Sequence, residues 1–427
     1  MQRSVWRRVH LYLALSVGLW FVLIGLTGSL SIYREQVDVL LNPSLAVENP
    51  PAARLSLDRI LASVKAAHPD RHGPWTLEMP ETANGMITAW YEKPSETTGE
   101  WYAPLMVSIN PYNGEVVASR FWGRTLTTWV LDLHTQLLAG ADGWRAVGYF
   151  GIVFCVSVIT GLYLSWPWLR RWPAHCSLRL DQGMTRMAFD LHHWLGFFGA
   201  LLLPMLILTG IHLSFPDKLE ALTGAAGMGH GDNGPPIRST SVPNNRPVTL
   251  EEAVLLARGP FPDAELRRIT TPAGANAIYR VDLRQRGEIN RKHPLTTVWI
   301  DRWSGHIKAA RDPYEFTIGQ RITTSLWPIH TGEAFGGAGR LVGFVAGGLP
   351  LLLYLSGLFV WLRKMGWVED RPVTFLQCRS IWIRVGERVR TAGEALYRFF
   401  ERHRPWLETK SVELWRKCIE LAGRIAK

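Results

Sequence analysis

The sequence predicts a mainly α-helical membrane protein with four transmembrane helices in a duplicated two-span arrangement and two extracytoplasmic α+β domains. Three observations predict this fold. Four uncharged apolar runs are each long enough to cross about 30 Å of hydrocarbon at about 1.5 Å per residue. Histidines and small polar motifs recur at matching places in both halves, and the two segments outside the spans share a strand pattern. The apolar runs are Leu11–Ile32, Ala146–Leu169, Leu191–Phe215 and Leu341–Leu362.

Four histidines recur together with four dipeptides, which we call the hydroxyl–glycine pairs. His10 and His192 each lie 18 residues before the glycine of such a pair (28 − 10 = 18 and 210 − 192 = 18). His134 recurs as His330, and one further pair also recurs, both at an offset of 196 (330 − 134 = 196 and 356 − 160 = 196). A histidine inside a membrane helix is costly, which makes a functional role the first hypothesis, although a histidine at a helix end also reaches the interface. The pairs are Thr27-Gly28, Thr160-Gly161, Thr209-Gly210 and Ser356-Gly357.

Charge predicts the topology. The 427 residues are 47% hydrophobic and 19% charged, with a mean hydropathy of +0.01, which suits a mixture of membrane and aqueous parts. Arginines precede the first span and fill the link between the second and third, so the positive-inside rule places both termini in the cytoplasm. A cleaved signal peptide would have an apolar core of about 7–15 residues, shorter than the first span. The net charge of +11 gathers beside the spans and in the tail, which favours anionic lipids over nucleic acid as its partner.

The two segments outside the spans each predict a helix packed on a small antiparallel sheet. Residues 107–114 and 298–305 resemble each other at an offset of 191 (298 − 107 = 191), and each predicts a β-hairpin with a glycine in the turn. Thr249 and Glu252 are spaced as a capping box at the start of one helix. The predicted helices are Ser56–Ala67 and Thr249–Ala257, and further strands are predicted at Met86–Tyr91 and Ala277–Leu283.

Cysteine usage and glycine motifs limit the possible cofactors. The four cysteines imply no disulfide framework, and no C-x-x-C-H motif is present for covalent haem attachment. The one G-x-G-x-x-G spacing, at residues 229–234, lies in the Gly-rich link Gly224–Pro236 and not between a strand and a helix, so we expect no flavin or nicotinamide site in the chain. A redox cofactor would therefore be held without covalent bonds, and its electrons would come from a partner.

The histidine motifs resemble those of the PepSY-associated transmembrane family. The resemblance rests on Leu191-His192-His193-Trp194-Leu195-Gly196 with Leu208-Thr209-Gly210, and on Pro328-Ile329-His330-Thr331-Gly332-Glu333 before the last span. It covers about residues 5–365, and the segments outside the spans resemble PepSY modules. The family includes iron-regulated inner-membrane proteins and haem-containing reductases that release iron from ferric siderophores in the bacterial periplasm.

The resemblance and the spans together predict nine parts of the chain. They are a cytoplasmic N-terminus (1–10), the first span (11–33), PepSY-like domain 1 in the periplasm (34–130), an outer-face histidine segment with the second span (131–169), a basic cytoplasmic loop (170–188), the third span (189–215), PepSY-like domain 2 (216–325), an outer-face histidine segment with the fourth span (326–362), and a basic amphipathic cytoplasmic tail (363–427).

The resemblance implies that the repeated histidines bind haem b, with two haems expected. Two axial imidazoles leave iron no open position, which suits one-electron transfer rather than oxygen chemistry. We expect His10 and His192 to hold one haem near the cytoplasmic face, and His134 and His330 to hold a second near the outer face. His212 is an alternative outer ligand, and His193 is a weaker candidate because it points about 100° away from its neighbour.

The expected function is that of an inner-membrane reductase that passes electrons to a periplasmic acceptor, with ferric siderophore iron as the acceptor that the family implies. The donor would be a cytoplasmic reductase or a quinol. Two alternatives stay open, a non-enzymatic accessory that binds peptides or regulates a transporter, and an electron-transfer subunit of a separate flavoprotein. Haem content separates the accessory from the other two.

Overall fold

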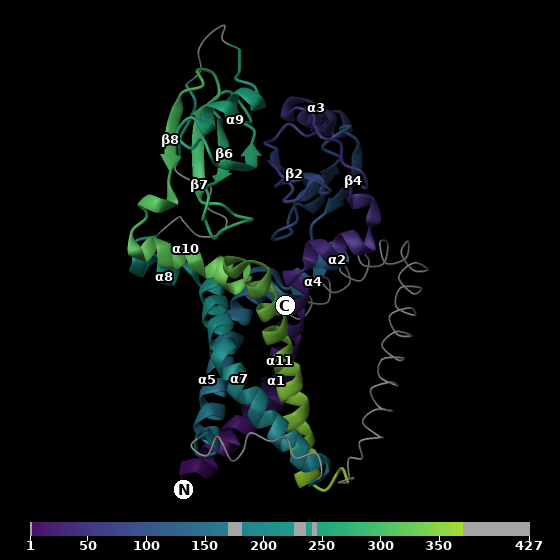
Figure 1. The fold of residues 1–427 in the computed structure, drawn as a ribbon, viewed down its shortest axis with the longest axis vertical. Helices are drawn as coiled ribbons and strands as arrows, with labels where there is room; N and C mark the ends of the chain where they lie inside the picture. The colour runs from purple at the N-terminus through teal and green to yellow at the C-terminus, as the bar shows by residue number, and fades with distance from the viewer. Residues whose placement is uncertain (1, 170–181, 226–235, 241–245, 370–427) are drawn as a thin grey trace, which may run out of the picture. The chain divides into compact units, whose positions relative to one another are not determined.

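The computed structural model describes residues 2–169, 182–225, 236–240 and 246–369 (Figure 1). They belong to two compact units. The first contains residues 2–169 and all described residues from 193 to 355, and the second contains residues 182–192 and 356–369. Most of the predicted basic loop and nearly all of the predicted tail lie outside the described residues.

Four helices are long and apolar enough to cross a membrane, which confirms the prediction of four spans. Each extends beyond its predicted apolar run by several residues, because a helix continues past the hydrocarbon until its backbone is capped or broken. The helices are α1 (Gln2–Ile32), α5 (Gly140–Leu169), α7 (Gly183–Ser214) and α11 (Gly336–Lys364).

Small residues bring the spans of the first unit into close contact. A Cβ atom on Gly25 of α1 would lie 2.4 Å from the carbonyl oxygen of Gly347 in α11, so only glycine fits at this crossing. One turn further on, the Ser29 hydroxyl donates to the carbonyl oxygen of Phe344 at 2.8 Å. On α5, Gly151 faces Ile211 of α7 in the same way. Close backbone approach at small residues is a general means of helix packing in membranes.

Outside the spans, one antiparallel sheet of eight strands runs in the order β4-β3-β2-β1-β5-β6-β7-β8. The predicted hairpins and strands are present, but the two predicted sheets are continuous because β1 pairs with β5, Leu77 lying opposite Ile269. The strands are β1 (Thr76–Glu78), β2 (Ile87–Tyr91), β3 (Leu105–Ile109), β4 (Val116–Phe121), β5 (Glu265–Thr270), β6 (Ile278–Arg284), β7 (Thr296–Asp301) and β8 (Ile307–Arg311).

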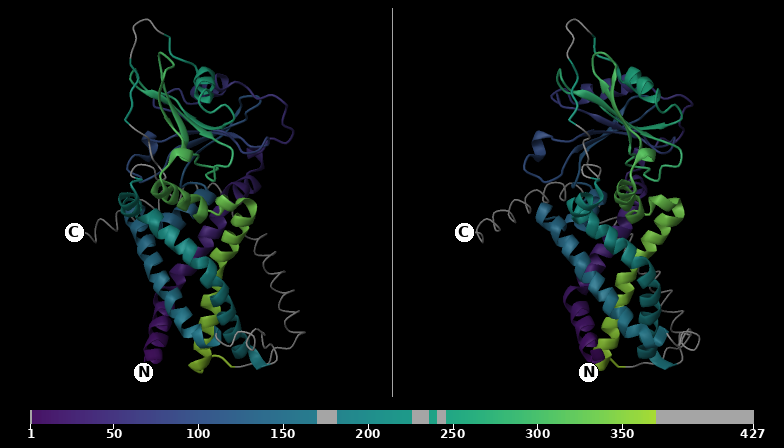
Figure 2. Two further views of the ribbon diagram at one scale, coloured as in Figure 1. Left: turned by 60° about the vertical axis from the view of Figure 1, so that its left-hand side comes forward. Right: turned by 90° about the vertical axis from the view of Figure 1, so that its left-hand side faces the viewer.

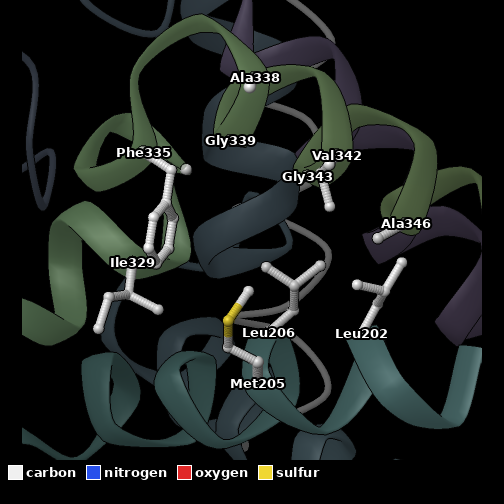
Figure 3. A pocket seen from close by; sticks show the side chains of 11 residues that line it. Leu202, Met205, Leu206, Ile329, Phe335, Ala338, Gly339, Val342, Gly343 and Ala346 are labelled. Carbon is white, nitrogen blue, oxygen red and sulfur yellow. The ribbon is translucent and has the colours of Figure 1, made fainter.

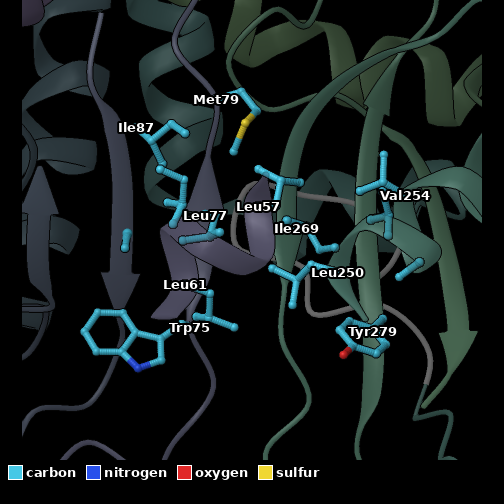
Figure 4. Packing of buried hydrophobic residues seen from close by; sticks show 14 of the residues in the cluster. Leu57, Leu61, Trp75, Leu77, Met79, Ile87, Leu250, Val254, Ile269 and Tyr279 are labelled. Atoms are coloured by element: carbon cyan, nitrogen blue, oxygen red, sulfur yellow. The ribbon is translucent and has the colours of Figure 1, made fainter. Parts of the chain in front are cut away.

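Two helices, α3 (Leu57–Ala67) and α9 (Leu250–Arg258), pack on this sheet and bury one apolar core with it (Figure 4). Each helix begins where it was predicted, α9 has the predicted Thr249–Glu252 capping box, and each helix also receives an acid from the other. The Glu251 carboxylate accepts the Leu57 N–H at 2.7 Å, and the Asp58 carboxylate accepts the Leu250 N–H at 3.0 Å. Because a helix N-terminus carries partial positive charge, these crossed acids join the two halves of the sheet.

Short helices connect the sheet to the spans (Figures 1 and 2). Two of them, α4 (Leu126–Gln136) and α10 (Ile318–His330), begin with threonine capping boxes and carry His134 and His330 in their last turns. The others are α2 (Arg34–Leu41) and α8 (Pro216–Thr223), with the 3-10 helices η1 (Pro43–Leu45), η2 (Ser95–Thr97), η4 (Pro313–Glu315) and η5 (Glu333–Phe335).

Candidate functional site

The structure brings two of the sequence-predicted histidines together. The ring centroids of His134 and His330 lie 6.2 Å apart, and their planes differ by 33°. We call these residues the sheet-side pair, because α4 and α10 join the sheet to the spans. Both rings are partly buried.

The separation of the sheet-side pair fits two imidazoles on opposite sides of one metal ion. An ion about 2.0–2.1 Å from each ring nitrogen would hold the two centroids about 6 Å apart. The spacing of the pair is compatible with bis-histidine axial ligation.

The Nδ1 atom of each ring already has a partner on a span. His134 Nδ1 lies 2.9 Å from the carbonyl oxygen of Ile24 in α1, and His330 Nδ1 lies 2.8 Å from the Thr209 hydroxyl in α7. A histidine that binds a metal through one nitrogen usually donates the other N–H to an oxygen, which fixes its tautomer and orientation. These contacts leave Nε2 of each ring as the nitrogen able to bind a metal ion.

Glycines make room for both rings. A Cβ atom on Gly28 would lie 2.7 Å from His134 Cε1, and one on Gly210 would lie 3.2 Å from His330 Cε1. Real Cβ contacts are essentially never below 3.0 Å, so a side chain at residue 28 would displace the imidazole. The glycine of each pair is thus part of the histidine site.

The other two histidines are held in the same manner. His10 Nδ1 lies 3.0 Å from the Thr160 hydroxyl, and a Cβ on Gly161 would lie 3.2 Å from its ring. Within the second unit, His192 Nδ1 lies 3.1 Å from the Ser356 hydroxyl, and a Cβ on Gly357 would lie 3.1 Å from its ring. Each repeated histidine therefore contacts one hydroxyl–glycine pair. The expected pairing of His10 with His192 joins different units and stays a prediction.

Burial keeps the sheet-side pair neutral. It lowers the pKa of His134, and burial together with the neighbouring His134 lowers the pKa of His330 to about 4. Both imidazoles are consequently uncharged at pH 7, which is the form that binds metal ions.

A family model described as the PepSY-associated TM region matches residues 7–364. The chain belongs to the PepSY-associated TM family. The match covers all four spans, the sheet and the four histidines, and confirms the resemblance seen in the sequence. No curated protein matches the chain.

The two weaker histidine candidates of this family member differ in what the structure shows. His212 lies on α7 two residues beyond Gly210, and within the described residues its buried Nδ1 has no hydrogen-bond partner. Its ring makes no ring contact with the sheet-side pair in the described part of the chain, and its place as an alternative outer ligand stays a prediction. His193 follows His192 on α7 and so points about 100° away from it around the helix axis.

Sequence reasoning did not assign the partners of the histidines. The hydroxyl–glycine pairs recur with the histidines, but helix packing explains their small residues equally well. The signal that would have assigned them is the shared offset, because each pair recurs together with its histidine. The Ile24 carbonyl had no such signal, since every residue has one.

An apolar cavity of about 280 Å³ lies beside the sheet-side pair, between α7 and α11 (Figure 3). Its lining includes Leu206, Phe335 and Ile329, the last of which precedes His330. Only apolar side chains and glycines line it, so it would exclude water and polar chelates while accepting hydrocarbon.

Proposed function

We propose that this chain is an inner-membrane di-haem b reductase that passes electrons to a periplasmic acceptor, most specifically ferric iron in a siderophore. The observation that carries this proposal is the sheet-side pair: two neutral imidazoles, 6.2 Å apart, each with Nδ1 on an oxygen and a glycine beside the ring.

The residues present fit a haem held without covalent bonds. His134 and His330 would supply the two axial nitrogens, and Gly28 and Gly210 would leave their rings unobstructed. When bound between two imidazoles, haem b supplies one-electron transfer without an open position for oxygen. The apolar side chains of α7 and α11 would keep water from the site.

His10 and His192 are proposed as the ligands of the second haem. The support is that each repeats the contact of His330, with Nδ1 on a Ser or Thr hydroxyl and the ring against the following glycine. Two sites at different depths would divide one long electron transfer into shorter ones.

The duplicated two-span arrangement gives this proposal its topology. The sheet would be two PepSY-like domains in the periplasm of a bacterial inner membrane, with both chain termini in the cytoplasm. This orientation follows from the arginines before the first span and between the second and third spans. It places the sheet-side pair near the outer face, where an acceptor arrives, and the basic segments beside anionic lipids.

Reduction of a ferric siderophore needs electron transfer and no nucleophile. One electron from a quinol or a cytoplasmic reductase converts one Fe(III) to Fe(II), and a quinol that gives two electrons also releases two protons. Hard oxygen ligands hold Fe(II) less tightly than Fe(III), so the iron leaves the chelate. The sheet would shape the surface on which the acceptor docks.

The first test is an absorption spectrum of the purified full-length protein, oxidised and reduced with dithionite, with haem counted per chain. We expect a sharp reduced α band and about two haems per chain. A colourless protein after expression with ample haem would overturn the proposal and favour the accessory role.

A second test separates an enzyme from an electron-transfer subunit. The loaded protein receives electrons from an artificial donor in the presence of a ferric siderophore, and an Fe(II)-specific chelator reports the product. Fe(II) formation by the isolated chain supports the reductase. Haem without Fe(II) formation would assign the chain as a subunit that needs a partner.

A further inference from the structure

The Thr209 hydroxyl lies among three polar atoms at the sheet-side pair. Its Oγ1 is 2.6 Å from the Met205 carbonyl oxygen, 3.1 Å from the Leu206 carbonyl oxygen and 2.8 Å from His330 Nδ1. Thr209 is buried, with 4% of its surface exposed, so water does not compete for these contacts.

Counting protons fixes the direction of each hydrogen bond. A hydroxyl has one proton and a carbonyl oxygen can only accept, so the Thr209 proton goes to the carbonyl of Met205 or Leu206. The lone pair of Oγ1 then accepts the Nδ1–H of His330, which it shares with the Leu206 carbonyl oxygen. A neutral imidazole carries one N–H, so the lone pair of His330 is on Nε2, on the side of the ring away from Thr209.

Thr27 occupies the corresponding place in the first half of the chain (27 + 182 = 209) but does not have this role. Its hydroxyl also donates to its own helix, to the carbonyls of Leu23 at 2.7 Å and Ile24 at 3.2 Å. His134 Nδ1, however, donates to the Ile24 carbonyl. The same threonine is therefore a histidine partner in one half and only a helix contact in the other.

We propose that Thr209 is a positioning residue that holds His330 as the Nε2 ligand and lowers the reduction potential of the sheet-side haem; this rests on the proposed function. An Nδ1–H that donates to an oxygen makes the imidazole a stronger electron donor, which stabilises Fe(III) over Fe(II). His330 has the Thr209 hydroxyl for this in addition to the Leu206 carbonyl, whereas the partner of His134 is the Ile24 carbonyl.

Thr160 has the same arrangement toward His10. Its hydroxyl donates to the Ser157 carbonyl at 2.9 Å and lies 3.0 Å from His10 Nδ1, so it too accepts from the imidazole. A hydroxyl that serves its own helix and a histidine at once therefore occurs at two of the proposed axial ligands.

The test compares Thr209→Val, Thr209→Ser and Thr27→Val in the full-length protein loaded with haem. Valine has the shape of threonine without the hydroxyl, and Thr27→Val removes an equivalent helix contact that touches no histidine. The readout is a redox titration followed by absorbance, with haem counted per chain. We expect Thr209→Val to raise the ratio of reduced to oxidised haem about tenfold at a fixed potential, in one of the two transitions. Thr209→Ser and Thr27→Val should keep the parent value.

Each outcome decides the inference. A ratio in Thr209→Val equal to that of Thr27→Val, or below it, overturns the inference while the loaded parent still supports the proposed function. If Thr209→Val loses the haem, retention by Thr209→Ser supports the hydroxyl's role and loss by both variants overturns it. A parent chain that binds no haem overturns the proposed function and this inference together.

Discussion

The two halves of the chain meet in two places, and they meet differently. In the sheet, β1 pairs with β5 through the backbone, and Asp58 and Glu251 each cap the helix of the other half. Between the sheet and the spans, the corresponding residues His134 and His330 have ring centroids 6.2 Å apart with no hydrogen bond between them. Hydrogen bonds therefore join the two halves in the sheet, whereas the two histidines meet only as neighbouring rings.

Removing a histidine of the sheet-side pair should have the largest effect on haem content. We expect His330→Ala to lower haem from about two to about one per chain, because a single axial imidazole leaves the iron weakly held or high-spin. His134→Ala should do the same. The pyridine haemochrome assay and the absorption spectrum measure both changes.

His212→Ala is the matched control for this prediction. It removes an imidazole from α7 close to the same site, but His212 is not in contact with the sheet-side rings among the described residues. Its haem content should equal that of the parent. Loss of one haem in His212→Ala together with retention in His134→Ala would replace His134 by His212 as the ligand.

A smaller effect on haem content is expected from adding one methyl group to a glycine beside the sheet-side pair. In Gly28→Ala the new Cβ would lie 2.7 Å from His134 Cε1, so the ring must move and haem occupancy should fall partly. In Gly210→Ala the distance to His330 is 3.2 Å, and the fall should be smaller.

Gly348→Ala is the control for the glycine variants, because a Cβ there has no atom within 4 Å in the described structure. Titration of haem into the three apoproteins gives the comparison. Equal affinities in all three would show that the glycines serve helix packing alone.

The sequence predicted the individual helices and hairpins better than the contacts between the two halves of the chain. The spans, α3, α9 and the hairpins have local signals, namely long apolar runs, the Thr249–Glu252 capping box and glycine turns. Strand β1 has three residues, too few to show an alternating pattern, and its pairing with β5 joins residues almost two hundred positions apart. Long-range pairing of short strands has no local signature.

The same holds for the candidate site. Recurrence of the four histidines indicated which residues matter, and their place at the ends of helices indicated a pairing by depth. The hydrogen-bond partners depend on how neighbouring spans face each other. A backbone carbonyl such as that of Ile24 cannot be distinguished from any other in the sequence.

The crossed caps of α3 and α9 should affect the free energy of unfolding without affecting the haem content. Asp58→Ala removes the acceptor of the Leu250 and Glu251 N–H groups, and we expect a loss of about 1 kcal/mol, typical of a helix cap. Glu251→Ala should cost a similar or smaller amount. Thermal unfolding followed by tryptophan fluorescence measures this loss, with haem per chain as the control. A fall in haem content would show that the contact between the two halves of the sheet also positions the sheet-side pair.

The two halves of the sheet should differ in how much their stability falls at acid pH. Asp301 is the last residue of β7, the third strand of the second half, and the first half has Asn110 at the corresponding place (110 + 191 = 301). Burial alone would raise the pKa of Asp301, but N–H groups of Ser304, Thr240 and Trp303 donate to its carboxylate and, with Lys308, hold this pKa well below its usual range.

A carboxyl whose pKa is lower in the folded than in the unfolded protein stabilises the fold above its unfolded pKa, and this contribution is lost as the pH falls below about 4. Asp301→Asn should therefore reduce the fall in melting temperature between pH 5 and pH 3, since an amide does not titrate. The converse variant, Asn110→Asp, should steepen the fall in melting temperature, but by less than Asp301 does. The Asn110 side-chain oxygen accepts one N–H, from Tyr112, whereas the Asp301 carboxylate accepts three. A parent and an Asp301→Asn protein with the same acid dependence would mean that this difference between the halves does not contribute to stability.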